Sequence, residues 1–558
     1  MLNKPATRKF LLYPLCCFIL IFAVFFHFFV IKNVLQYPWW HQMGNDIDGA
    51  YATISVGLIN DSPLQFTHHP GATVFSLQGL VFRLLSIVSE PHQALGNLSL
   101  VSNTEEAFKI IETAVKTGRV LALLTAAGFI IFLFHFLYFM SGRLLLAFLI
   151  AFYIATSKAF LFHTYVIRPE LLNLFFFLLA VAWFFSQLSV SLSWMWMMVP
   201  IGFLLGCSVF AKIQIGPAVA IFFVLLARYC QQLSRAAAPR DISGSLRRAC
   251  FLSALGNFVL FPWWTLKRPA FITAEYLSAM HPDADALKLY GKAPEGFGIP
   301  VLVIMLLFLS LSLMCFLFKE PRQKLVKQAI SYLLPLNLII SGSILSTYCI
   351  LLPVSMSFKG YIENTQHLVY SVFTNVLYGG YVWNKHFNPD TFKKIFHQHA
   401  AESSLLGLNI LYFVAVVLAI SAWQYFKKNS QSSKEHYFCV LFFLMTGLVM
   451  DIFSTLRSWT LYSHYAFYSI CFYGLGLAMG VAGEKGKGEE GFGYKKIFNV
   501  RCAAAAVLAV HLMVVSWQWV TTPKADASSS HNLKDELMNI QAHSQPFFEM
   551  ITQAIQSH

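Results

Sequence analysis

Charged residues are scarce in this sequence. Only 12% of its 558 residues are Asp, Glu, Lys or Arg, and 57% are hydrophobic, whereas a typical soluble domain carries about 25% charged residues. Several apolar runs approach or exceed the roughly 20 residues that a helix needs to cross a bilayer. The composition excludes an ordinary soluble protein. It predicts a multi-pass membrane protein built from helices, because a membrane barrel would show short alternating segments instead.

Three further absences narrow the function. The ten cysteines lie mainly in the apolar runs or at their ends, so no disulfide framework is indicated. No Gly-rich phosphate loop is present, so a nucleotide pocket is not expected. Ionisable residues are nearly absent from the middle of the apolar runs, where proton- and ion-coupled transporters place them. Matching helices broken by Gly or Pro in two halves of the chain, another transporter feature, are not evident either.

The net charge of +14 is explained by membrane topology. When residues 1–9, which are basic, are placed in the cytoplasm, the basic excess falls on the short segments assigned inside, and the outer segments balance. The charge therefore gives no reason to expect a nucleic-acid partner. We predict spans at about residues 10–31, 119–140, 144–160, 171–188, 194–211, 213–229, 249–266, 299–318, 329–353, 404–426, 437–453, 466–482 and 497–519.

The predicted fold class is an all-α polytopic membrane protein with about 13 transmembrane helices. Residues 1–519 form the transmembrane domain, and residues 32–118 form a first outer loop with interfacial helices. Residues 267–300 and 357–403 are predicted as further long outer loops. An odd number of spans leaves residues 520–558 outside, as a short tail with a short helix.

The first outer loop carries the most chemically suggestive residues. Asp46 and Asp48 stand two residues apart, before a predicted helix over residues 49–59, and His68 and His69 follow it. Two such carboxylates can share a divalent cation, or one can take the proton of an attacking hydroxyl while the other orients that hydroxyl. Alternatively, Asp48 caps the helix. The histidines could bind a metal with Asp48, although their spacing matches no strong metal signature.

Further charged and polar residues stand at other predicted outer turns. Arg168 and Glu170 open the fourth span, and Lys212 lies between the fifth and sixth. The two cations could bind an anion or simply extend to the membrane interface, and Glu170 could simply suit the positive end of a helix dipole. Arg457 and the pair His464-Tyr465 follow late in the chain, where the pair could be ordinary interface residues.

In this order the motifs resemble those of the GT-C glycosyltransferases that use polyprenyl-phosphate sugars. The closest resemblance is to the family 39-like group of protein O-mannosyltransferases and the lipid A aminoarabinose transferase. Two motifs depart from that pattern. Asp46-Ile47-Asp48-Gly49 stands where the family often has an adjacent acidic pair followed by aromatics, and His69-Pro70-Gly71 stands where it often has His-Pro-Pro.

The resemblance implies a GT-C-like fold and inverting sugar transfer on the extracytoplasmic side, with Asp46 or Asp48 as the catalytic group. It implies a polyprenyl-phosphate-linked sugar donor, a lipid, glycan or protein acceptor, surrounding membrane lipids and no nucleic acid. We expect a bacterial inner membrane location and no certain cofactor, with a divalent cation as an alternative at the acidic pair. A lipid-linked transporter or flippase is the second interpretation, and a membrane scaffold the third. The implied substrate-binding residues are His68, His69, Arg168, Glu170, Lys212, Arg457, His464 and Tyr465.

Overall fold

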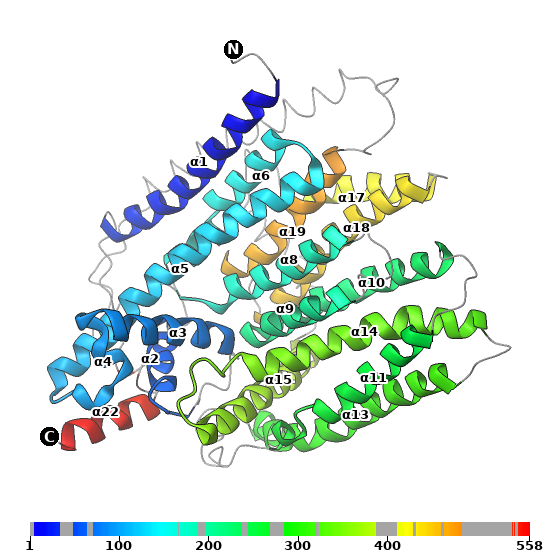
Figure 1. Cartoon of the computed structure of the whole chain (residues 1–558). Helices are drawn as coiled ribbons and strands as arrows, with labels where there is room; N and C mark the ends of the chain where they lie inside the picture. The colour runs from blue at the N-terminus through cyan, green and yellow to red at the C-terminus, as the bar shows by residue number, and fades with distance from the viewer. Residues whose placement is uncertain are drawn as a thin grey trace. The chain divides into compact units, whose positions relative to one another are not determined.

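The structure is a computed structural model, and its described residues form α-helices and 3₁₀ helices joined by turns, with no strand among them (Figure 1). By contacts, the chain divides into two compact units, which we describe separately. The described residues are 5–33, 48–63, 71–165, 167–187, 196–236, 244–267, 284–317, 323–386, 410–427, 431–458, 463–482, 538, 541 and 545–557.

Six helical segments in the described part of the chain are long and apolar enough to cross a membrane. Each coincides with a predicted span, which supports a multi-pass membrane protein. Four shorter apolar helices lie at other predicted spans. The total of thirteen stays a prediction, because residues 497–519 lie outside the described residues. The six long segments are Thr104–Ser141, Pro169–Ser186, Ile213–Gln231, Phe297–Leu317, Gln328–Cys349 and Lys434–Phe453.

The first unit contains residues 1–45, 119–167 and 386–536. Within it, α19 packs against α18, α6 and α7. A buried polar pair joins α18 to α19, since the Tyr473 hydroxyl donates to Asp451 Oδ2 at 2.6 Å and neither residue is exposed. Its helices are α1 (Pro5–Asn33), the later part of α5 (Thr104–Ser141), α6 (Leu144–Thr156), α7 (Lys158–Tyr165), α17 (Ile410–Lys427), α18 (Gln431–Ser458) and α19 (Ser463–Ala482).

The predicted span at 144–160 is wrong as a single helix. The chain leaves the helical conformation at Ser157, between α6 and α7. The Ser157 hydroxyl donates to the Ile154 carbonyl at 2.7 Å and accepts from the Phe160 amide at 3.3 Å. A serine side chain can satisfy backbone groups in this way and so compete with the helical ladder.

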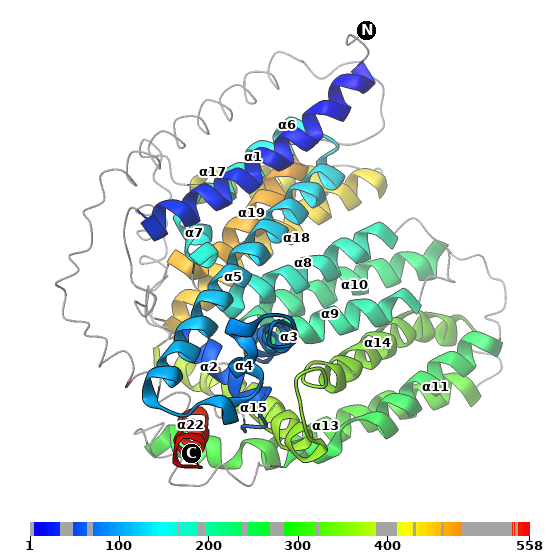
Figure 2. The same cartoon turned by 60° about the vertical axis from the view of Figure 1, so that its left-hand side comes forward.

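The second unit contains residues 46–118, 168–385 and 537–558. At its centre α9 packs against both α8 and α14, and α11 and α13 pack with α14 (Figure 2). Its helices include α2 (Asp48–Leu58), α3 (Ala72–Val88), η1 (Glu90–His92), α4 (Gln93–Gly96), η2 (Leu98–Leu100), α8 (Pro169–Gln187), α9 (Met198–Ala211), η4 (Ile213–Ile215), α10 (Gly216–Ala236), α11 (Gly244–Leu260), η5 (Trp263–Leu266), α13 (Ala284–Leu317), α14 (Gln323–Cys349), α15 (Phe358–His386) and α22 (Gln545–Ser557).

Helices α9 and α14 approach so closely that two glycines are required. A Cβ atom at Gly202 would overlap the Ile339 carbonyl, and one at Gly342 would overlap the Val199 carbonyl. The Ser343 hydroxyl donates to the Gly202 carbonyl at 3.0 Å across the same contact. Small residues commonly permit such backbone approach between membrane helices, where apolar side chains gain little by leaving lipid.

Two of the predicted outer loops contain helices that the sequence analysis did not predict. Residues 358–386 form the 29-residue helix α15, and α13 begins at Ala284. Polar and aromatic composition concealed the helix in the first case. Residues 364, 365 and 367–371 are all buried along α15, so this part of the helix is buried on every side.

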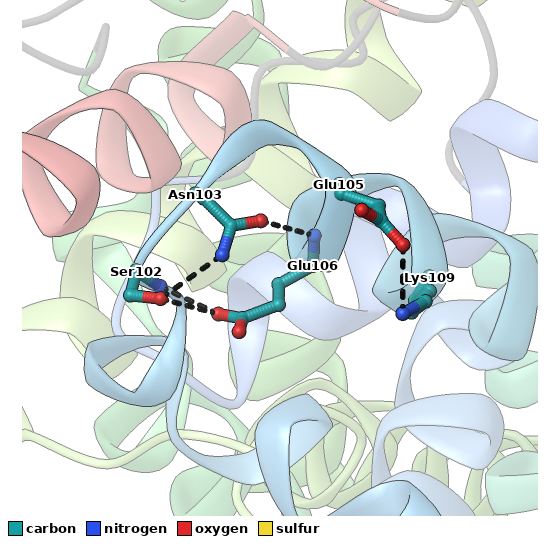
Figure 3. Close-up of polar contacts among 5 residues, drawn as sticks. All are labelled: Ser102, Asn103, Glu105, Glu106 and Lys109. Atoms are coloured by element: carbon teal, nitrogen blue, oxygen red, sulfur yellow. Dashed lines mark hydrogen bonds and ion pairs between the residues drawn. The ribbon is translucent and has the colours of Figure 1, made fainter.

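Helix α5 begins at Thr104, before the predicted second span, and its first turn is held by polar side chains (Figure 3). Asn103 Oδ1 accepts from the Glu106 amide at 3.0 Å. Glu106 Oε2 in turn accepts from the Ser102 amide at 2.8 Å and hydroxyl at 2.9 Å, and Lys109 pairs with Glu105 at 3.0 Å. These bonds satisfy amide groups that a helix start leaves without helical partners.

Candidate functional site

Three buried charged side chains meet at one end of α8 and α9. Glu170 Oε1 accepts a short hydrogen bond from Lys212 Nζ and lies 3.5 Å from Arg168 Nη1. The exposed fractions of Arg168, Glu170 and Lys212 are 4%, 0% and 0%. We call these three residues the charge cluster. It contains two cations and one carboxylate.

Local structure explains how these residues reach their positions. Pro169 begins α8, where its missing amide hydrogen costs nothing, and Glu170 lies in the first turn. At the first turn the negative charge of Glu170 interacts favourably with the positive end of the helix dipole, as the sequence analysis expected. Lys212 is the extended residue that ends α9, with φ −161° and ψ 124°. The chain then passes through η4 into α10 at Gly216.

Neutral polar residues lock the Lys212 backbone to α8. The Asn173 side-chain amide donates to the Ser208 carbonyl at 2.7 Å and to the Lys212 carbonyl at 2.5 Å. The Ser208 hydroxyl returns a bond to the Asn173 carbonyl at 2.7 Å. Asn173 and Ser208 are both fully buried. The end of α9 is therefore held in register with α8, and Lys212 is fixed close to Glu170.

The burial of the cluster contradicts the interface alternative for its cations. A residue that extends to the interface keeps its charged head in water, whereas the Arg168 and Lys212 side chains are each only 1% exposed. Removing charges from water is expensive unless they are paired and hydrogen-bonded. The shared carboxylate of Glu170 supplies such a partner and holds the two positive groups near each other.

The acidic helix α2 connects to this region through α3. Tyr51, one turn after Asp48, packs its ring 5.4 Å from that of Phe75, and a Cβ atom at Gly71 would touch the same tyrosine. At the start of α3 the Thr73 hydroxyl donates to the Cys207 carbonyl of α9 at 2.8 Å. The beginnings of α2 and α3 are thus tied to the part of α9 that precedes Lys212.

The remaining expected site residues are described only in part. Asp48 is the first residue of α2, which confirms the predicted helix there, but its side chain lies outside the described set. Arg457 belongs to α18, and His464 and Tyr465 belong to α19, all three in the first unit. Their side chains are likewise not described, and Asp46, His68 and His69 lie outside the described residues.

Metal binding at the acidic pair stays a prediction. In the part of the chain that the structure describes, no three His, Cys, Asp or Glu side chains are grouped in a way that could hold a metal ion. The side chains of the acidic pair and the two histidines, which would supply the ligands, lie outside the described set.

Sequence reasoning overlooked Asn173, Ser208 and Gln214. One signal was available for the first of them. Asn173 follows Glu170 by three residues, so both lie on one face of α8, and a buried amide in an otherwise apolar helix requires partners. Nothing in the sequence pairs Ser208 with Asn173, because 35 residues separate them.

Comparisons with known proteins do not assign a family. No protein-family model and no curated protein matches the chain. It is similar to the solved structure of an archaeal oligosaccharyltransferase, AglB from Archaeoglobus fulgidus, in complex with an inhibitory peptide and a dolichol-phosphate. That alignment has 15% identity and a TM-score of 0.40, and it covers 98% of this chain and 56% of the other.

A second similar structure is the apo form of the Archaeoglobus fulgidus oligosaccharyltransferase, with 14% identity and a TM-score of 0.39. That alignment covers 97% of this chain and 56% of the other. The chain thus spans little more than half of each of these proteins. Similarity at this level carries no functional argument.

Proposed function

We propose that this protein is an integral membrane glycosyltransferase that transfers a sugar from a polyprenyl-phosphate donor to an acceptor on the extracytoplasmic side, with inversion. The observation that supports it most is the charge cluster of Arg168, Glu170 and Lys212. All three side chains are buried, and the two cations share one carboxylate. The order of motifs in the sequence, which resembles the GT-C enzymes, supports the same proposal.

The leaving group of this reaction explains why two cations are needed. When the bond between the sugar and the phosphate breaks, the electron pair stays on a phosphate oxygen, and the lipid phosphate gains negative charge. Cations already oriented at that position stabilise the developing charge without having to reorganise. Arg168 presents several donors, whereas Lys212 acts as a compact charge. Glu170 keeps both cations in place before the donor arrives.

The acceptor side of the reaction requires a base. In the proposed step an acceptor hydroxyl oxygen attacks the anomeric carbon from the face opposite the phosphate, which inverts that carbon. Asp46 or Asp48 takes the hydroxyl proton, or holds a divalent cation that lowers its pKa. The contacts that tie α2 through α3 to α9 support placing an acidic group near the donor site. His68, His69, Arg457, His464 and Tyr465 remain proposed contacts to the substrates.

The proposed setting is a bacterial inner membrane, with a lipid, glycan or protein as the acceptor. The donor would enter from the bilayer, since its polyprenyl chain is apolar and partitions into lipid. The tail helix α22 packs on α2, with Phe548 against Ala50. This contact supports placing the tail on the same side as the first loop, as an odd number of spans requires.

A lipid-linked transporter or flippase is the second candidate function. Its supporting observation is Asp451, which is fully buried in a helix apolar enough to span the membrane and accepts a hydrogen bond from Tyr473. Ionisable residues inside spans often belong to transport pathways. The glycosyltransferase is favoured because the charge cluster lies at helix ends, whereas a transport site is expected near the membrane midplane.

The proposal is tested by a transfer assay on the purified full chain. Labelled polyprenyl-phosphate mannose, glucose and aminoarabinose are supplied with a membrane extract as the source of acceptors. We expect at least one donor to release free polyprenyl phosphate. Asp46→Asn or Asp48→Asn should lower the rate by about 10²–10⁴-fold if that residue is the base, since an amide cannot take the proton.

Glu105→Gln is the matched control, because it neutralises a carboxylate of the same loop that is 80% exposed. Its rate should equal that of the wild type. Full transfer by both Asp→Asn variants would remove the catalytic assignment. Movement of intact donor across liposomes without sugar release would favour the flippase instead.

A further inference from the structure

Two buried amide oxygens lie next to Lys212 without a hydrogen-bond partner among the described residues. They are Asn173 Oδ1 and Gln214 Oε1. Asn173 is fully buried, and Gln214 is 5% exposed. Asn173 bonds the Lys212 carbonyl directly, and Gln214 follows Lys212 by two residues in η4. Both residues therefore adjoin the backbone of Lys212, one through a hydrogen bond and the other along the chain.

An unsatisfied buried acceptor is costly. Leaving one without a donor costs about 1–3 kcal/mol, and buried polar groups that have no partner call for an explanation such as a water or a ligand. A molecule that brings hydrogen-bond donors to this position would recover the cost.

The orientation of Asn173 is fixed by its other bonds. Its nitrogen donates to two carbonyl oxygens, of Ser208 and Lys212, which an amide oxygen cannot do. The side chain therefore cannot be flipped, and its free oxygen can only accept. Gln214 makes no such bonds among the described residues, and it is the better residue to alter because it does not hold the Lys212 backbone.

We infer that the Gln214 and Asn173 amide oxygens accept hydrogen bonds from hydroxyl groups of the donor sugar, so that they read the sugar while the charge cluster holds its phosphate. This inference rests on the proposed function. An ionised phosphate diester offers no hydrogen to an amide oxygen, and a polyprenyl chain offers none either. The hydroxyl groups of a sugar are the part of such a donor that can satisfy these acceptors.

Because Lys212 and Gln214 contact different parts of the donor in this inference, their substitutions should affect the binding of different ligands. Lys212 contributes to binding any lipid phosphate, with or without a sugar. Gln214 contributes only when the sugar is present. A site that hydrogen-bonds a hydroxyl discriminates strongly against a ligand that lacks it, because the buried polar group is then left unpaired.

The test compares binding of farnesyl phosphate with that of mannosyl, glucosyl and aminoarabinosyl farnesyl phosphates to the full chain in detergent. We expect the wild type to bind at least one glycosylated lipid more tightly than farnesyl phosphate. Gln214→Met should bind farnesyl phosphate like the wild type and lose roughly tenfold affinity for that glycosylated lipid, the equivalent of one hydrogen bond. Gln553→Met, on the exposed side of α22, should change neither.

Stability separates a ligand contact from a structural role. Gln214→Met replaces an unpaired acceptor by an apolar group of similar size, so the melting temperature without ligand should not fall. A fall of several degrees would assign Gln214 to the fold and overturn the inference. Unchanged sugar affinity in Gln214→Met would overturn it as well, and would leave a bound water at this oxygen.

The proposed function fails in a different way. If the wild type does not bind farnesyl phosphate, or if Lys212→Met binds it equally well, the phosphate site itself is refuted and the inference falls with it. If farnesyl phosphate binds through Lys212 but no sugar adds affinity, only the sugar-reading role is refuted.

Discussion

The contact between Lys212 and Glu170 predicts an unequal response to the loss of each partner. In Lys212→Met the Glu170 carboxylate keeps Arg168 at 3.5 Å as a second cation. In Glu170→Gln both buried cations lose the carboxylate that they share. We therefore expect Glu170→Gln to be the more destabilised variant and the double variant to be less destabilised than the sum of the two.

The magnitude follows from the burial of the groups. Breaking a buried ion pair by removing one partner typically costs about 3–5 kcal/mol, and both charged groups here are at most 1% exposed. The stability loss of Lys212→Met should lie near or below the lower end of this range, because one cation remains beside the carboxylate. Glu170→Gln should fall near the upper end. The coupling energy of the cycle should lie at about 1–3 kcal/mol.

The cysteines of the chain provide the assay. Five of them, Cys207, Cys230, Cys250, Cys315 and Cys471, are free and buried. A fluorogenic thiol reagent should therefore report unfolding in detergent as they become accessible. The melting temperatures should decrease in the order wild type, Lys212→Met, Glu170→Gln. Lys359→Met serves as the control, because this lysine side chain is 85% exposed and its ion pair is worth little.

Two results would refute the reasoning. Equal melting temperatures for the wild type, both single variants and the double variant would mean that the cluster does not contribute to folding. A double variant whose loss equals the sum of the single losses would show that Lys212 and Glu170 do not interact, contrary to the structure.

Three further predictions concern other parts of the molecule. Gly202→Ala should lower the melting temperature by several degrees, because the added methyl overlaps a backbone carbonyl of α14; the thiol assay measures this. Burial lowers the pKa of His367 to about 3, so this group stabilises the fold above pH 6.5 and loses that effect as the pH falls toward 3. The free energy of unfolding should drop by about 2 kcal/mol between pH 7.5 and 5 through this residue, and denaturant titrations at both pH values measure it. Compartment reporters fused at Arg240 and Ser528 should lie in the cytoplasm and outside it, respectively.

Each of these predictions has its own control or contrary outcome. Gly128→Ala adds the same methyl where nothing lies within 4 Å, and an equal effect of the two alanines would contradict the helix contact. His367→Gln should remove the stated part of the pH dependence, and an unchanged drop would assign it to other groups. Both reporters in one compartment would contradict the topology on which the external position of the acidic loop depends.

The membrane helices were largely predictable, because a helix needs about 20 apolar residues to cross a bilayer and such runs are visible without any tertiary information. The break at Ser157 was not, since it depends on a side chain that competes with the helical ladder. Helix α15 was missed because its polar residues suggested a loop, and its buried residues 364, 365 and 367–371 form a nearly continuous run without a helical period. In both cases a local choice of hydrogen bonds or packing decided the structure.

The charged residues of the candidate site were predictable from the sequence, whereas the contacts between them were not. Arg168, Glu170 and Lys212 attract notice because charges are rare next to apolar spans. That Lys212 pairs with a carboxylate 42 residues away follows only from the packing of α9 on α8. The neutral residues Asn173 and Gln214 carry no charge to draw attention, and their unsatisfied oxygens become visible only when burial is known.

The most direct measurement is the affinity of the purified protein for farnesyl phosphate, compared between wild type, Lys212→Met and the exposed-lysine control Lys359→Met, below the melting temperature of each. Charge-assisted hydrogen bonds contribute about 1.5–3 kcal/mol. If the charge cluster binds the donor phosphate, Lys212→Met should bind farnesyl phosphate roughly 10- to 100-fold more weakly than the wild type. Lys359→Met should bind it like the wild type. Equal affinity of all three proteins would contradict the assignment of the cluster to the phosphate.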